Sequence, residues 1–122
     1  MFKKATMSDV RLSNFRNVYG TKYHAQRTEY DGIKFASKKE CLRYIELKNR
    51  LKDGTIQDLK LQVPYILIEK SQYGRAIKYI ADFTYTEFGE FVVEDVKGMK
   101  TPVYKLKKRL MAEKYGIVIK ES

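Results

Sequence analysis

Two carboxylates and a lysine stand out near the middle of the chain, inside short runs of apolar residues. Asp82 interrupts one run, Asp95 interrupts the next, and Lys97 follows two residues after Asp95. Acidic side chains in such runs need a partner, because burying an unpaired charge is costly. Two carboxylates beside a lysine suit a Mg²⁺ site, with Mn²⁺ as a substitute, that hydrolyses phosphodiester bonds.

The spacing of the two runs predicts that Asp82 and Asp95 face each other. Residues 76–86 and 90–97 have the composition of β-strands, and Phe88-Gly89 between them is typical of a two-residue turn. Pairing across this turn places Asp82 opposite Asp95 in an antiparallel hairpin. The Cβ atoms of directly opposed residues lie roughly 4.5–5.5 Å apart.

Alternation along the strand decides which neighbours share the face of Asp95. Lys97 falls on that face, and Glu94 falls on the other, where we expect a solvent-side or supporting charge. A one-residue bulge in the turn would instead place Glu94 or Val96 opposite Asp82. The structural alternative is that both aspartates are solubilising charges of an edge strand.

The elements that must position these residues are signalled by turns and caps. Ser37 and Glu40 form a capping box at the start of a helix, and Asp53-Gly54 ends it. Thr101-Pro102 starts a second helix, with threonine at the cap and proline in the first turn. The expected order is a hairpin at 28–35, a helix at 38–52, strands at 56–63 (stopped by Pro64), 65–69, 76–86 and 90–97, a helix to Tyr115, and a strand at 117–120.

Motif and element order together resemble the PD-(D/E)XK nuclease superfamily. Asp82, a spacer and Asp95-Val96-Lys97 are similar to its D…(D/E)-x-K signature, although Ala81 stands where the motif's name has proline. The stretch from Lys22 to Lys120 also resembles a group of small phage proteins assigned to that superfamily. The resemblance implies an α/β fold: a restriction-endonuclease-like αβββαβ core with a mixed central sheet, plus an N-terminal arm and hairpin.

The same resemblance implies roles for individual residues. Asp82 and Asp95 would be metal ligands, and the carbonyl of Val96 would be a third oxygen ligand. Lys97 would orient the attacking water. Glu40 matches an acidic residue that many members place on the first helix as a third carboxylate, although its place in the capping box explains it equally well.

Composition points to a polyanionic partner and excludes several other chemistries. The net charge is +10, and both ends of the chain are basic while the middle is nearly neutral. A single cysteine, Cys41, and a single histidine, His24, exclude an internal disulfide and multi-cysteine or multi-histidine zinc sites. The widely spaced glycines cannot form a nucleotide-binding loop, so we expect no nucleotide cofactor.

The sequence predicts a cytoplasmic protein without membrane contact, because it has no apolar run of membrane-spanning length and no signal peptide. If a phage encodes it, this is the cytoplasm of the bacterial host.

The basic ends are the expected nucleic-acid contacts. Residues 1–27 are predicted to be a basic arm, and residues 28–122 a single nuclease-like domain. Phosphate contacts are expected from side chains in the arm and around the second helix, although a solvated helix face is the alternative: Lys22, Arg27, Lys100, Lys105, Lys108 and Arg109.

These patterns together predict a metal-dependent DNA endonuclease. A domain this small covers little DNA, so we expect a homodimer. By analogy, a structure-selective enzyme such as a junction resolvase, or a phage recombination or packaging nuclease, fits the chain. The main alternative is a non-catalytic nucleic-acid-binding module that retains the nuclease fold, and a further one is a small assembly protein that binds a nucleoprotein.

Overall fold

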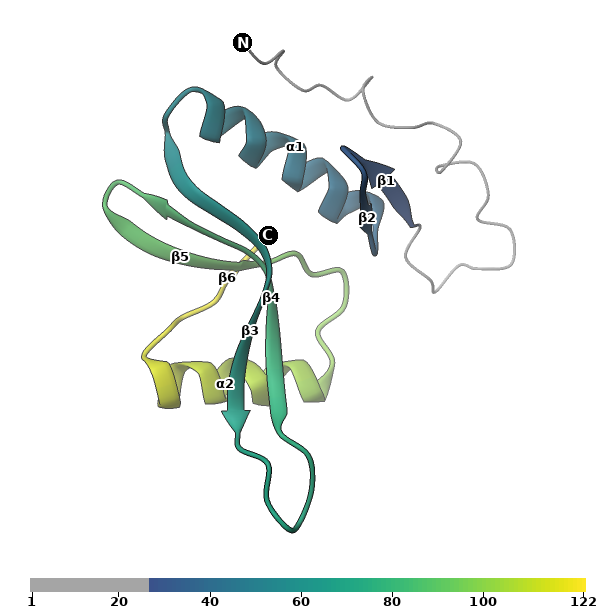
Figure 1. The fold of residues 1–122 in the computed structure, drawn as a ribbon, viewed down its shortest axis with the longest axis vertical. Coiled ribbons are helices and arrows are strands. Elements are labelled where there is room, and N and C mark those ends of the chain that lie inside the picture. Colours follow the sequence, from purple (N-terminus) through teal and green to yellow (C-terminus); the bar gives the residue numbers. More distant parts are fainter. Residues whose placement is uncertain (1–26) are drawn as a thin grey trace. The chain divides into compact units, whose positions relative to one another are not determined.

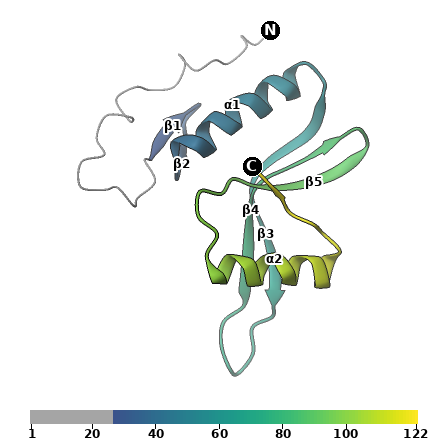
Figure 2. The same ribbon diagram turned by 180° about the vertical axis from the view of Figure 1, so that it is seen from behind.

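A computed structural model describes residues 27–122 of the protein. The chain divides into two compact units, with the boundary between Thr55 and Ile56. Figures 1 and 2 show the elements of each unit from opposite sides. Each unit is described by itself below.

The first unit contains a short hairpin and a long helix. Strands β1 (Thr28–Tyr30) and β2 (Ile33–Phe35) pair antiparallel through a tight turn at Asp31-Gly32. Both turn residues have positive φ, at 55° and 74°, as a two-residue hairpin turn requires. The hairpin predicted at residues 28–35 is therefore confirmed.

Helix α1 (Lys38–Lys52) has the predicted bounds because its cap is local. The Ser37 side chain accepts a hydrogen bond from the Glu40 backbone N–H at 3.0 Å. The helix buries an apolar side that includes Cys41, Tyr44 and Leu47. Burial and the neighbouring Glu40 raise the pKa of the Cys41 thiol to about 11, so Cys41 is a core residue and a poor nucleophile.

The second unit is a four-stranded mixed sheet with one helix. Its strands lie in the order β3 (Ile56–Ile68), β4 (Ile77–Glu87), β5 (Glu90–Asp95) and β6 (Lys120–Glu121). The first three pair antiparallel, and β6 pairs parallel to β5 after the chain crosses through α2 (Pro102–Tyr115). The order is α1, three strands, α2 and a last strand, whereas the sequence pattern predicted four strand segments between the helices.

The prediction that Pro64 ends a strand is wrong. β3 runs through Pro64, which pairs with Ile80 of β4. In the sheet of the second unit, β3 is an edge strand and has a neighbour on one side. Proline lacks the N–H that a central strand would need, but an edge strand tolerates the loss. The last strand is also shorter and later than predicted.

Helix α2 packs across β3 and β4, as both ribbon views show, and closes the core of this unit (Figures 1 and 2). Tyr104 and Met111 are its buried residues, and the core adds residues from all four strands or their flanks: Leu67, Tyr79, Ala81, Val93 and Ile119. Two apolar residues of this helix, Val103 and Leu106, are exposed. In the described part of the chain, neither helix is long and apolar enough to span a bilayer.

Candidate active site

The hairpin between β4 and β5 has the register that the sequence predicts. Glu87 pairs with Glu90 across the Phe88-Gly89 turn, and the pairing continues without a bulge to Phe83 and Glu94. The next position in this register sets Asp82 opposite Asp95. The two-residue turn fixes this arrangement, because both of its residues have positive φ.

Beyond Asp95 the chain keeps an extended course beside the C-terminal strand. The Ser122 N–H donates to the Asp95 carbonyl at 3.0 Å, and the Lys97 N–H donates to the Ser122 carbonyl at 3.1 Å. Because peptide groups alternate in direction, those of Val96 face the opposite side, toward β4. The Val96 N–H indeed donates to Asp82 Oδ2 at 2.8 Å. The same alternation predicts that the Val96 carbonyl lies on the β4 side of the chain.

Lys97 lies against the Asp95 carboxylate. Its Nζ is 3.0 Å from Asp95 Oδ2 and 4.2 Å from the centre of the Tyr104 ring. Asp95 is only 2% exposed. The Lys97 ammonium supplies charge to Asp95 Oδ2 but does not meet hydrogen-bond geometry, and no other described residue donates to this oxygen. Asp95 Oδ2 is therefore a buried, anionic oxygen with lone pairs to offer a cation.

A pocket of about 350 Å³ joins these residues. Asp82, Asp95 and Lys97 line it together with two lysines that sequence reasoning missed, Lys78 of β4 and Lys107 of α2. The wall also includes Tyr79, Ile80, Thr101, Val103 and Tyr104. Lys107 follows Tyr104 by three residues, so the two share a face of α2. Recognising Tyr104 as the buried residue of this helix would therefore have identified Lys107 as a pocket residue.

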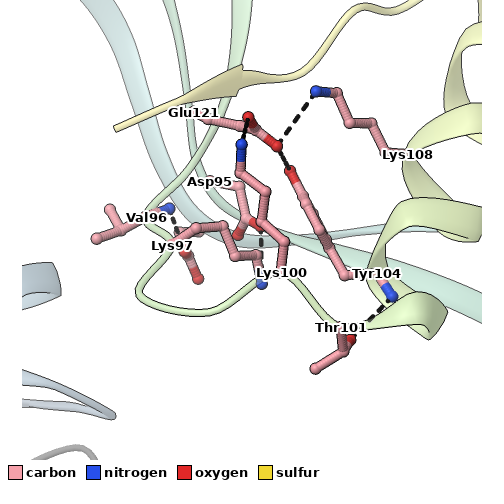
Figure 3. Close-up of polar contacts among 9 residues, drawn as sticks. Asp95, Val96, Lys97, Lys100, Thr101, Tyr104, Lys108 and Glu121 are labelled. Carbon is pink, nitrogen blue, oxygen red and sulfur yellow. Dashed lines mark hydrogen bonds and ion pairs between the residues drawn. The ribbon is translucent and has the colours of Figure 1, made fainter.

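A second cluster of charges lies beside the pocket and is centred on Glu121 of β6 (Figure 3). Its carboxylate pairs with Lys100 Nζ at 2.9 Å and Lys108 Nζ at 3.2 Å, and it accepts a hydrogen bond from the Tyr104 hydroxyl at 2.7 Å. Hydrogen bonds from Lys100, Tyr104 and Lys108 lower the pKa of Glu121 to about 2. Lys108 therefore lies on the side of α2 that faces β6, so the alternative of a merely solvated face does not describe it.

Glu94 is neither solvent-side nor exposed. It is 0% exposed, accepts a hydrogen bond from the Tyr85 hydroxyl at 2.6 Å, and accepts another from Ser122 Oγ at 2.7 Å. Both partners satisfy its carboxylate oxygens within the protein. The part of its prediction that survives is a supporting role, because Glu94 fastens the C-terminal residue beside the strand that carries Asp95.

The other described site residues belong to both units. Glu40 is buried on α1 in the first unit, and its ligand role stays a prediction. Lys105 and Arg109 are exposed on α2, and Arg27 is exposed before β1; Lys22 lies outside the described residues. Among residues 27–122, no group of three or more His, Cys, Asp or Glu side chains is close enough together to hold a metal ion.

The strand opposite Asp82 is distorted. In β3, Leu61 pairs with Phe83 of β4 and Val63 pairs with Ala81. Gln62, between them, is therefore opposite Asp82. Gln62 has φ of 53°, in the left-handed region that residues with side chains seldom adopt. Such backbone strain often occurs beside functional residues.

One protein family matches this chain. The family is described as "Protein of unknown function (DUF1064)", and its model matches residues 20–121. The match covers most of the chain, so the protein belongs to this family. No curated protein and no solved structure matches the chain.

Proposed function

We propose that the protein is a metal-dependent DNA endonuclease whose active site is the pocket between β4, β5 and α2. The observation that carries the proposal is the pair of opposed carboxylates, Asp82 and Asp95, with a lysine 3.0 Å from Asp95. An edge-strand pair that served only solubility would be exposed, whereas Asp95 is buried and lines a pocket.

The donor set suits Mg²⁺ or Mn²⁺. Asp82 and Asp95 offer hard anionic oxygens, and the carbonyl of Val96 is predicted to lie on the β4 side of the chain. The buried Asp95 Oδ2 receives no hydrogen bond from a described residue and has the Lys97 ammonium 3.0 Å away, so it keeps lone pairs that could ligate a cation. A bound Mg²⁺ would polarise the phosphoryl oxygen and lower the pKa of its water.

The lysines of the pocket suit a phosphodiester substrate. Lys97 is placed to orient the attacking water or to neutralise the charge that develops on the phosphate. Lys78 and Lys107 have no carboxylate partner among the described residues, so their charges are available to the flanking phosphates. With two carboxylates and three lysines, the pocket attracts a polyanion even before a cation is bound.

The proposal includes a fold and an assembly. The order α1, β3, β4, β5, α2, β6 and the mixed sheet support a restriction-endonuclease-like core. DNA is the proposed substrate, with Lys100, Lys105, Lys108, Arg109, Lys22 and Arg27 as further contacts. A homodimer is proposed because one small domain covers little DNA, and sedimentation equilibrium tests this directly.

A plasmid assay tests the proposed activity. Protein incubated with supercoiled plasmid and Mg²⁺ should convert it to open circles or linear DNA, and EDTA should prevent the conversion. The Asp82→Asn variant, prepared identically, should show no cleavage. Equal cleavage by parent and variant would assign the activity to a contaminant or to another site.

A nucleic-acid-binding module is the second candidate. The Lys97 ammonium already balances the charge of Asp95, so the pair is also compatible with a structural role. DNA binding without cleavage in Mg²⁺ or Mn²⁺ would favour this function over the nuclease.

A further inference from the structure

Tyr79 of β4 has a buried hydroxyl with no evident role in folding. The residue is 4% exposed, and its hydroxyl oxygen has no hydrogen-bond partner among the described residues. An unsatisfied buried polar group costs about 1–3 kcal/mol relative to a paired one. Phenylalanine at this position would fill the same space without that cost.

The other buried tyrosines of this unit differ, because their hydroxyls have hydrogen-bond partners. The Tyr85 hydroxyl donates to Glu94 at 2.6 Å, and the Tyr104 hydroxyl donates to Glu121 at 2.7 Å. Both lock one strand or helix onto another, which explains why a tyrosine stands there. Tyr79 has no such contact with a described residue, so a partner for its hydroxyl is to be sought outside residues 27–122.

The surroundings of Tyr79 indicate which partner. Tyr79 lines the same pocket as Asp82 and Asp95. Burial, and then Asp95, Tyr104 and Asp82, raise the pKa of its hydroxyl, so the hydroxyl stays protonated and can donate or accept. The second buried atom without a hydrogen bond is Asp95 Oδ2. The two residues that carry these atoms thus line one pocket and interact electrostatically.

We propose that Tyr79 is a positioning residue whose hydroxyl hydrogen-bonds a water of the divalent cation held by Asp82 and Asp95. The inference rests on the proposed function, since it presupposes a cation at these carboxylates. A hydrated cation would serve both atoms: Asp95 Oδ2, which has the Lys97 ammonium beside it but no hydrogen bond from a described residue, would ligate the ion, and the Tyr79 hydroxyl would hydrogen-bond one of its waters. Residues that hydrogen-bond the groups bound to a metal orient those groups and contribute to metal affinity.

Mn²⁺ binding and unfolding of the Tyr79→Phe variant test this role without an activity assay. Electron paramagnetic resonance of free Mn²⁺ should give a dissociation constant about 10- to 100-fold weaker than that of the parent protein. The thermal midpoint without added metal should be unchanged or higher, because the variant removes an unsatisfied hydroxyl. Added Mn²⁺ should raise that midpoint less than it does in the parent.

Tyr85→Phe is the matched control, because it removes a buried hydroxyl that does have a partner. It should lower the midpoint and leave Mn²⁺ affinity unchanged. If Tyr79→Phe also lowers the midpoint, its hydroxyl has a structural partner and the inference is wrong.

Asp95→Asn separates this inference from the proposed function. If Asp95→Asn loses Mn²⁺ binding while Tyr79→Phe binds like the parent, the cation site stands and the role of Tyr79 is refuted. If the parent protein binds no Mn²⁺, both the inference and the metal-dependent activity are refuted.

Discussion

At the scale of single residues, Asp95 is held between a like charge and an opposite one. Its register neighbour is Asp82, and Lys97 Nζ lies 3.0 Å from its carboxylate. Removing the Lys97 charge and neutralising Asp95 itself should therefore change stability in opposite directions. These directions can be measured in the protein without added metal.

Lys97→Ala should destabilise the fold. The substitution leaves a buried carboxylate beside Asp82 without its cation, and unpaired buried charges are costly. We expect a loss of about 1–3 kcal/mol in the free energy of unfolding, below the range for fully buried pairs because the Lys97 side chain is 26% exposed. Urea unfolding gives the value, and Lys105→Ala, exposed on α2, should change it by less than about 0.5 kcal/mol.

Asp95→Asn should be at least as stable as the parent. The amide keeps the volume of the side chain and removes the repulsion with Asp82. The positive charge of Lys97 then still offsets the negative charge of Asp82. The same urea experiment measures it. If Asp95→Asn were the more destabilised of the two variants, the carboxylate pair would be a folding device, and the idea that it is held together for catalysis would fail.

At the scale of elements, Glu121 joins β6 to α2 and to the loop before it. Its contacts with Lys100, Lys108 and Tyr104 keep its pKa near 2, well below the ordinary value of 4.5. A carboxyl whose pKa is lowered by folding stabilises the native state when it is ionised. That stabilisation is fully present above about pH 4.5 and is lost as the pH falls toward 2.

Glu121→Gln should therefore flatten the acid side of the stability curve. We expect the parent to lose more stability than the variant between about pH 4.5 and pH 2, and the variant to be less stable at pH 7. Thermal midpoints measured across this range check the prediction. Parallel curves for the two proteins would show that Glu121 does not couple β6 to α2.

Local signals in the sequence account for the parts of the fold that were predicted correctly. Ser37 and Thr101 cap their helices through hydrogen bonds that span three residues, and both helices have the expected bounds. The two-residue turn at Phe88-Gly89 sets the register that opposes Asp82 and Asp95. Each of these features depends on a few adjacent residues, so a single sequence reveals it.

The features that sequence reasoning missed depend on distant residues. Pro64 is tolerated because β3 is an edge strand, which only the strand order reveals. The buried side of α2 is set by Tyr104, whose hydroxyl partner Glu121 lies 17 residues away. Glu94 is buried because Ser122 returns to it from the end of the chain.

At the scale of the whole molecule, the net charge of +10 should act through particular phosphate contacts. Lys78→Ala and Lys107→Ala should each reduce the slope of log affinity against log salt by about 0.9 on duplex DNA, since each removes one contact. Fluorescence anisotropy in the presence of EDTA measures binding alone. Lys114→Ala is the control, because the Lys114 Nζ donates to the Ile66 carbonyl at 2.9 Å, away from the pocket. Equal slopes for all three variants would show that the pocket does not bind DNA.

The central claim is that the Asp82 and Asp95 pocket cleaves DNA with a divalent cation. The most direct measurement is the initial rate of plasmid nicking in Mg²⁺ by the parent and by Asp95→Asn, at protein concentrations where both bind DNA equally. Asp95→Asn removes one anionic ligand and keeps the volume of the side chain, so we predict nicking by the parent and none by the variant. Nicking by Asp95→Asn at the rate of the parent would contradict the claim.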